Sequence, residues 1–279
     1  MSFSILNNTS SLSAQNQLTN TQFNLNNTLL QLASGSRLNS GANDAAGLAI
    51  ADGLHANEQA LSQSQRNASD GVGKLQVADG ALSQVTNLLD RAVTLATEAS
   101  TGTVTSTQQT ALNNEFSKIK TEIDNIGANT TFNGTSVFAS GTTSIFLSDA
   151  SSNYTIGMSV GTLSSSGIQD SSGSSVNLST DALTSTSAAQ SALSDINSAI
   201  ANVASKRGQV GATINQLQAA GNVISTQLQN ITTADDNIRA ANIPQEISAL
   251  SQYNILTQTG ISALAQANAA QQAVLKLVG

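Results

Sequence analysis

The chain has 279 residues, of which only 10% are charged and 3% are aromatic, and its formal net charge is -7. Its ten Lys and Arg residues are scattered, which excludes the clustered positive charge that nucleic acid binding requires. The absence of Cys excludes disulfides and cysteine-based metal sites.

Residues 2–33 are predicted to form one amphipathic helix that ends near Gly35, a residue suited to a helix C-cap. The apolar positions recur in steps of three, four and seven: Leu18, Leu25, Leu29 and Leu32. A stripe this narrow is typical of a helix that pairs with another helix. Residues 1–10 lack the basic and apolar regions of a cleaved signal peptide, so we expect a cytosolic protein or export by another route.

Residues 35–56 are small and interrupted by Gly, which predicts a compact connector with some helix. A helical period returns over 57–99, where Gly71 and Gly73 indicate either a bend or a close helix contact. A third helix is predicted over 106–126. No stretch is long and apolar enough to insert into a membrane.

The character of the sequence changes after the third helix. Asn133-Gly134 is a turn dipeptide, and alternation within 136–160 predicts short strands. The Ser/Gly-rich residues 161–180 are typical of a surface loop or weakly ordered tip. Helix resumes over 184–233, and a short break is expected over 235–242.

The last helix has a clear predicted start, with Asn242 as the cap and Pro244 where a missing N–H is harmless. Its apolar residues also follow one stripe: Ile243, Ile247, Leu250, Ile261, Leu264, Leu275 and Val278. The two ends of the chain therefore match each other, and each needs a partner helix. We expect the chain to complete its packing against copies of itself.

The predicted fold class is mainly α: an elongated antiparallel helical bundle or coiled coil formed by the N- and C-terminal helices, with a small β-hairpin region and a short Ser/Thr/Gly-rich tip in the middle. The simplest arrangement is a rod that runs outward, turns at the β tip and returns. The predicted parts are a terminal coiled-coil domain (1–34 and 243–279), connectors (35–56 and 234–242), a helical rod (57–134 and 182–233) and the tip (135–181).

Candidate chemical sites are few. His55 is the only His and the HExxH metalloprotease pattern is absent, so no metal site is expected. Arg37 and Asp44 could form an ion pair that orders the connector, or they could be independent solvated charges. No nucleophile–base pair, phosphate-binding loop or cofactor motif occurs, so we predict a non-enzyme without a catalytic site or cofactor.

The chain resembles the bacterial flagellins over nearly its whole length, with matching blocks in order at both ends. The N-terminal blocks are 11–15, 34–40, 44–51, 66–71, 80–82, 115–116 and 132–134. The C-terminal blocks are Arg207, 210–212, Asn215, 238–239, Glu246, 255–256 and 264–268. So many ordered blocks make a specific signal. The resemblance implies a structural subunit of the flagellar filament used for swimming motility.

The family resemblance also implies partners and a location. The subunit would be secreted through the flagellar type III export apparatus, assisted by a chaperone and by cap and junction proteins. It would then self-assemble into a helical homopolymer outside the cell. The residues expected to carry self-assembly are Leu18, Leu25, Leu29, Leu32, Arg37, Asp44, Ile247, Leu250, Ile261, Leu264 and Leu275.

In this family a helical surface is read by a vertebrate innate immune receptor, and it maps onto Arg91, Leu95 and Glu115. Thr94 and Asp90 replace the Glu and Gln that are usual there. Three other functions remain open. They are a hook–filament junction protein of the same family, a cytosolic coiled-coil scaffold and an enzyme with a cryptic site.

Overall fold

The computed structural model describes residues 8–149 and 153–278, and the chain divides into two compact units. Unit 1 combines Met1–Ala56 with Asn230–Gly279, and unit 2 is Asn57–Gln229. Helices dominate both units, and the β structure is confined to small antiparallel pairs, so the predicted mainly α class is confirmed. The predicted division into four parts stays a prediction.

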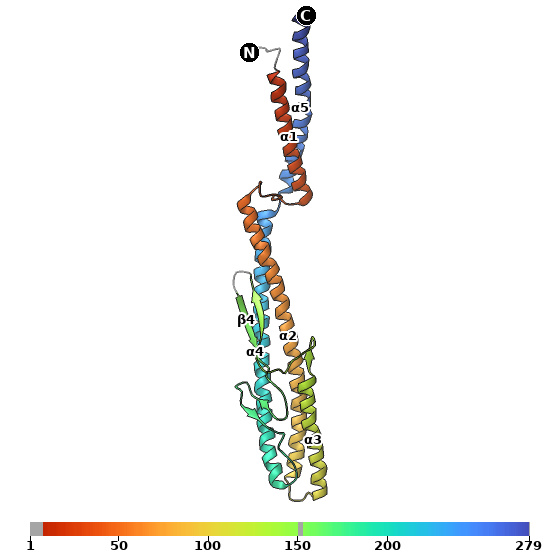
Figure 1. Cartoon of the computed structure of the whole chain (residues 1–279), viewed down its shortest axis with the longest axis vertical. Helices are drawn as coiled ribbons and strands as arrows, with labels where there is room; N and C mark the ends of the chain where they lie inside the picture. Colours follow the sequence, from red (N-terminus) through yellow and green to blue (C-terminus); the bar gives the residue numbers. More distant parts are fainter. Residues whose placement is uncertain (1–7, 150–152, 279) are drawn as a thin grey trace. The chain divides into compact units, whose positions relative to one another are not determined.

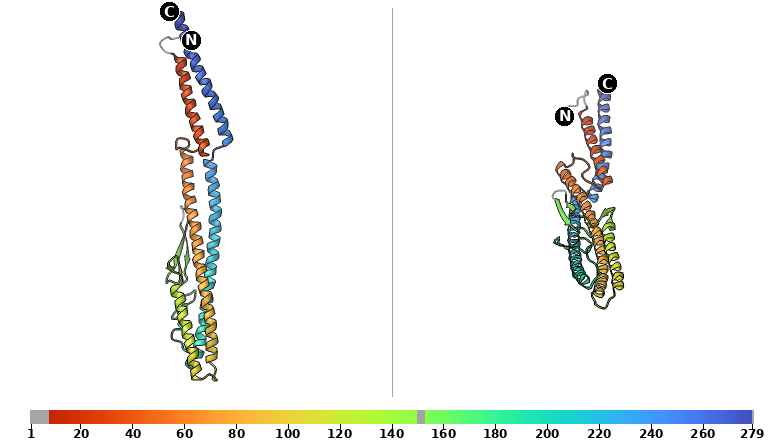
Figure 2. Two further views of the ribbon diagram at one scale, coloured as in Figure 1. Left: turned by 90° about the vertical axis from the view of Figure 1, so that its right-hand side faces the viewer. Right: turned by 60° about the horizontal axis from the view of Figure 1, so that its bottom comes forward.

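The terminal helices of unit 1 form an antiparallel pair (Figures 1 and 2). Helix α1 is Thr9–Ser34 and α5 is Ile243–Val278. The Asn8 side chain caps α1 by accepting a hydrogen bond from the Ser11 amide at 2.9 Å, and Gly35 ends the helix at a φ of 68°. The predicted start of the first helix at residues 2–7 lies outside the described residues.

The face of α1 that packs against α5 differs from the predicted stripe. Leu18, Leu25 and Leu32 are half-buried, but the positions between them are the buried Thr21 and Thr28. The Thr21 hydroxyl donates to the Gln17 carbonyl at 2.8 Å, so its polar atom is satisfied within the helix. Leu29, which was expected in the stripe, is 44% exposed.

Unit 2 is built on residues 57–99 of α2 (Ala45–Ala99), α3 (Ser106–Asn129) and residues 186–229 of α4 (Thr186–Arg239). Figure 1 shows α3 lying along α2 and α4. Small and branched apolar side chains fill the core, which includes Leu61, Leu75, Leu82, Leu89, Phe116, Ile123, Ile196, Val203 and Leu217. Long helices packed side by side therefore need few aromatic residues.

Helix α2 begins twelve residues before the predicted start at 57, because Asp44 caps it and Gly47 and Gly53 are tolerated inside it. Helix α4 likewise continues through the predicted break at 235 to Arg239. Gly71 lies inside the continuous helix α2. A Cβ there would lie 3.0 Å from Ile145 and 3.1 Å from Leu217, so Gly71 permits a close packing contact.

The described residues between α3 and α4 form three antiparallel hairpins. The first pairs β1 (Thr131–Phe132) with β2 (Thr135–Ser136) through Asn133 and Gly134, whose φ angles are 48° and 73°. Such positive angles belong to the tight hairpin turn that Asn-Gly favours. The other two pair β3 (Thr143–Ser148) with β4 (Asn153–Met158), and β5 (Ile168–Gln169) with β6 (Ser175–Val176).

These hairpins lie along the helices of unit 2, so the prediction that the chain turns at a β tip is wrong (Figures 1 and 2). The Ser64 hydroxyl of α2 donates to the Ser148 carbonyl at 2.8 Å, and the Asn67 amide donates to Phe146. The loop from α2 to α3 and the segment before α4 lie at the far end of the helices.

Residues 160–183 are also more ordered than a surface loop. Leu163, Ile168 and Leu178 are buried. Polar side chains of α3 and α4 hold the backbone of this segment through Asn113, Lys120, Asp124, Asn202 and Lys206. The low apolar content of this segment is compensated by side chain to backbone hydrogen bonds.

Replacing Gly127 by Ala should destabilise unit 2, because a Cβ there would overlap the carbonyl oxygen of Leu163. Backbone must then move, and overpacking of this kind costs about 1–3 kcal/mol. Gly80→Ala is the matched control, since its Cβ meets nothing within 4 Å and should raise helix stability by about 0.5–1 kcal/mol. Urea unfolding followed by circular dichroism gives the free energy of unfolding of both variants. Equal changes of the same sign would contradict the close contact between Gly127 and Leu163.

Lys206 should make the stability of unit 2 depend on alkaline pH. Its ammonium group is buried and donates a hydrogen bond to the Val160 carbonyl at 2.7 Å. Burial lowers the pKa of Lys206 below the ordinary 10.5, and the negative charge of Asp170 partly offsets this by raising it. Between the lowered and the ordinary pKa the unfolded chain binds more protons, so the free energy of unfolding rises with pH. Urea unfolding at increasing pH should show a steeper rise in the wild type and in exposed Lys118→Gln than in Lys206→Gln, which keeps the contribution of Lys120, whose pKa burial also lowers. An identical slope in all three proteins would refute it.

Candidate assembly surface

Helix α1 carries large apolar side chains that the α1–α5 pair leaves uncovered. Leu12, Phe23 and Leu30 are 59%, 66% and 59% exposed. The steps of eleven and seven residues between them place all three on one side of the helix, away from the buried Thr21 and Thr28. Leu29 lies between this exposed face and the packed side of the helix, and at 44% exposure much of its side chain remains accessible.

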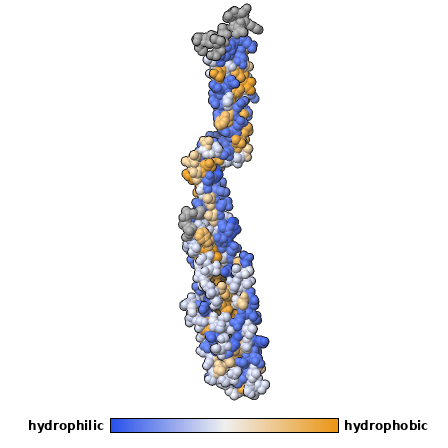
Figure 3. Space-filling view, in the orientation of Figure 1, coloured by the Kyte–Doolittle hydropathy of each residue, from blue (hydrophilic) through white to orange (hydrophobic). Residues whose placement is uncertain are grey.

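Helix α5 also carries large exposed apolar side chains, on more than one side of the helix. Ile247, Ile255 and Ile261 are 50%, 61% and 54% exposed, and Ile243 and Leu256 are each 39% exposed. Leu250 and Leu264 are half-buried. The space-filling view shows apolar residues at the surface over this helix pair (Figure 3). The predicted Leu275 belongs to α5, but its side chain lies outside the described residues.

The terminal helices carry almost no charge. The sequence of α1 contains no Asp, Glu, Lys or Arg, and that of α5 contains only Glu246 and Lys276. Close approach is allowed where Gly260 of α5 meets Leu18, because a Cβ at Gly260 would lie 3.2 Å from Leu18 Cδ1. These faces therefore offer apolar area rather than ion pairs to another molecule.

The two connectors of unit 1 pair with each other directly below the helix pair. The Arg37 amide donates to the Arg239 carbonyl at 2.8 Å, and the Ala241 amide donates to the Gly35 carbonyl at 2.9 Å. Ser36 and Ala240 form an antiparallel bridge at the same place. Main-chain hydrogen bonds thus join the end of α1 to the end of α4.

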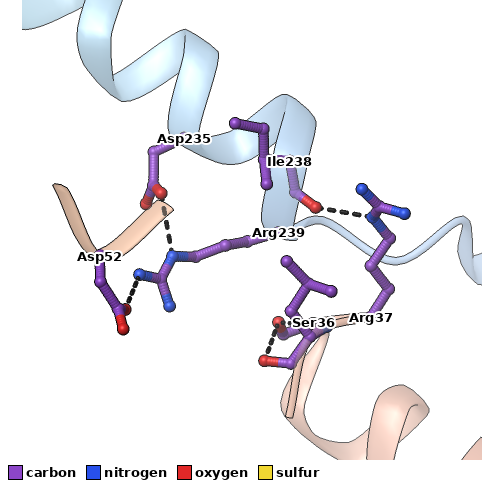
Figure 4. A network of polar contacts seen from close by, with 7 residues as sticks. Ser36, Arg37, Asp52, Asp235, Ile238 and Arg239 are labelled. Atoms are coloured by element: carbon purple, nitrogen blue, oxygen red, sulfur yellow. Dashed lines mark hydrogen bonds and ion pairs between the residues drawn. The ribbon is translucent and has the colours of Figure 1, made fainter. Parts of the chain in front are cut away.

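Arg239 lies at the centre of this connection (Figure 4). Its Nε donates to Asp235 at 2.9 Å on the same helix, and its Nη2 donates to Asp52 of α2 at 2.8 Å. The Asp235 side chain is only 12% exposed, so its charge needs this partner. These hydrogen bonds raise the pKa of Arg239 above its ordinary value, with the Asp235 bond as the larger cause.

The predicted connector residues Arg37 and Asp44 have separate partners. The Nε of Arg37 donates to the Ile238 carbonyl at 2.6 Å, as Figure 4 shows. The Asp44 carboxylate accepts from the Gly47 amide at 2.8 Å and caps α2. A Cβ at Gly47 would overlap this carboxylate. Both residues therefore order the connector, though each binds backbone groups.

The expected immune-receptor residues are only partly at the surface of unit 2. Arg91 of α2 and Glu115 of α3 form an exposed ion pair at 2.8 Å, and the hydrogen bond to Glu115 raises the pKa of Arg91. Leu95 is 1% exposed and belongs to the core. Its side chain is therefore unavailable to a receptor in this structure.

Unit 2 also has a shallow groove of about 450 Å³ between α2, α4 and the β3–β4 hairpin. Its lining is mostly apolar and includes Leu61, Leu147, Tyr154, Ala220, Val223 and Ile224. Val223 is 60% exposed and Tyr154 is 50% exposed.

Within the described residues, none of the helices has the length and hydropathy that a membrane span requires.

Two family models match this chain. The bacterial flagellin N-terminal helical region matches residues 5–143, and the bacterial flagellin C-terminal helical region matches residues 193–278. A curated flagellin from Halalkalibacterium halodurans is 33% identical over 96% of this chain and 97% of its own length.

The chain belongs to the bacterial flagellin family.

A second flagellin, from Bacillus subtilis, is 30% identical over 97% of this chain and 98% of its own length. The crystal structure of a Bacillus cereus flagellin aligns at a TM-score of 0.48 and 28% identity, covering 61% of this chain and 94% of that one. The two family models and the two curated flagellins confirm the resemblance inferred from the sequence. This flagellin is a structural subunit of the extracellular flagellar filament and not an enzyme.

Several residues of this flagellin's candidate assembly surface and connectors were missed from the sequence. Leu12, Phe23 and Leu30 follow a second apolar period that a search for one stripe overlooks. Asp235 and Arg239 have the four-residue spacing of a helical ion pair, which is a usable signal. No local pattern relates Asp52 to Arg239, because 187 residues separate them.

Proposed function

We propose that this flagellin self-assembles into a helical homopolymer in which α1 and α5 pair within one subunit and pack between subunits. The observation that carries the proposal is the row of exposed apolar side chains on both helices, including Phe23, Ile255 and Ile261. Monomeric soluble proteins rarely leave so many large apolar groups uncovered on one pair of helices. A neighbouring copy of the same pair would cover them.

The near absence of charge on α1 and α5 supports a homopolymer. Stacked copies of a strongly charged helix would repel one another, whereas uncharged apolar faces can approach closely. Export through the flagellar type III apparatus, with a chaperone, is proposed for the monomer. Cap and junction proteins are proposed as partners at the two ends of the growing filament.

Negative-stain electron microscopy of purified full-length protein, grown on short filament seeds, tests the proposal. A matched protein that lacks residues 243–279 serves as the control. Long filaments from the full-length protein alone are expected, because removal of α5 leaves the apolar face of α1 unpaired. The filament role would be contradicted if both proteins stayed monomeric or added only a short layer of subunits at the ends of the seeds. A short layer at the seed ends would favour a hook–filament junction protein.

A further inference from the structure

The connectors of unit 1 leave the chain little freedom. Only residues 35–44 separate α1 from α2, and only residues 240–242 separate α4 from α5. The direction in which α1 and α5 extend from the connectors is therefore decided within a few residues. The apolar faces of the pair meet another subunit correctly only if this direction is reproducible.

Arg239 binds three neighbours at this point. Its guanidinium group joins Asp52 of α2 to Asp235 of α4, and its carbonyl accepts the amide of Arg37. The planar guanidinium fixes the angle between two acceptors, which a Lys ammonium group does not do. One residue thus ties the beginning of α2, the end of α4 and the connector after α1.

The contribution of the Arg239–Asp52 ion pair to the stability of the fold should be small, whereas the loss of the Asp235 partner would act within unit 1. The Asp52 side chain is 64% exposed, and ion pairs with an exposed partner contribute little to stability. The core residues of unit 2 lie elsewhere on the helices. A change at Arg239 should therefore alter the geometry of the connectors without unfolding unit 2.

Resting on the proposed filament function, we infer that Arg239 is a positioning residue for assembly. Its links to Asp52, Asp235 and the Arg37 amide set the direction in which the α1–α5 pair leaves the connectors. That direction presents the exposed faces of both helices to neighbouring copies. Loss of the guanidinium group leaves the main-chain bonds of the connectors in place but unties the start of α2 from the end of α4. The pair then samples several directions, and only a fraction of the subunits can join a filament.

The test compares Arg239→Gln, Asp52→Ala and the double variant in seeded filament growth. The critical concentration of Arg239→Gln is expected to rise about tenfold, while the melting temperature of unit 2 stays unchanged. Asp52→Ala should give a smaller rise, and the double variant should be no worse than Arg239→Gln alone because both act through one contact. Arg66→Gln is the matched control, since the bonds of Arg66 to other described residues go to Ser62 and Gln63 of its own helix.

The outcomes separate this inference from the filament function. If wild type and Arg66→Gln form no filaments, the proposed function fails and takes the inference with it. If both grow and Arg239→Gln grows at the wild-type critical concentration, the positioning role alone is overturned. A raised critical concentration accompanied by an equally lowered melting temperature, or additive effects in the double variant, would also overturn it.

Discussion

The double substitution Phe23→Gln with Ile255→Gln is expected to raise the critical concentration for filament growth by roughly 30- to 1,000-fold. Phe23 is 66% exposed and Ile255 is 61% exposed, so most of each side chain remains to be buried on assembly. Full burial of such a side chain yields about 1.5–3 kcal/mol, which leaves about 2–4 kcal/mol for the pair. Sedimentation of seeded filaments at increasing protein concentration measures the change.

The matched control for this experiment is Asn24→Gln with Asn254→Gln. Both Asn residues are exposed neighbours of the substituted positions, and the control introduces the same Gln side chains without removing apolar area. Gln favours helix more than Phe or Ile does, so weakened helices would not account for a loss of assembly. A critical concentration in the Phe23 and Ile255 variant equal to that of the control would rule out these faces as subunit contacts.

Truncation of Phe116 to Ala is expected to lower the free energy of unfolding of unit 2 by about 3–5 kcal/mol. Phe116 is 1% exposed and is the largest fully buried side chain in the described core. Its ring also lies 5.0 Å from the Lys120 ammonium group, and this cation–π contact would be lost. Denaturant unfolding followed by circular dichroism measures the change.

Phe146→Ala provides the control, because the same atoms are removed from a residue that is 47% exposed. Its cost should stay below about 1.5 kcal/mol, in proportion to the smaller area that it buries. Equal losses for the two variants would show that Phe116 does not anchor the packing of α3. A loss at Phe116 with a strongly reduced denaturant dependence would instead indicate that two-state unfolding had failed.

Much of the local structure was accessible from the sequence because its causes are local. The Asn133-Gly134 turn follows from the tolerance of these residues for positive φ, and both adopt it. The start of α5 at Ile243 follows from the Asn242 cap, whose side chain accepts the Gln245 amide at 3.4 Å. The flagellin family itself was identifiable from short blocks at both ends, since these survive in order over nearly the whole chain.

The faces of the helices were less accessible. In α1, Thr28 and Leu29 each continue a pattern of three and four steps between Leu25 and Leu32. Hydrophobicity favours Leu29 as the inward residue, yet Thr28 is 5% exposed and Leu29 is 44% exposed. The family resemblance likewise indicated Leu95 as a surface residue, whereas the structure buries it. The angular position of a residue around its helix follows from the local sequence. Which side of the helix is buried depends on a partner helix that is distant in sequence.

The sequence by itself determined the dominance of helix, the caps at Gly35 and Asn242, the hairpin turn and the family, because these depend on groups within a few residues or on ordered blocks. Only the tertiary structure decided that the β hairpins lie along α2 and α4, that Gly71 is a packing contact for Ile145, and that Arg239 joins Asp235 to Asp52. Each of these facts requires groups that the chain brings together over tens to hundreds of residues. Side-chain volume, burial and hydrogen-bond geometry select such contacts, and no periodicity along the chain encodes them.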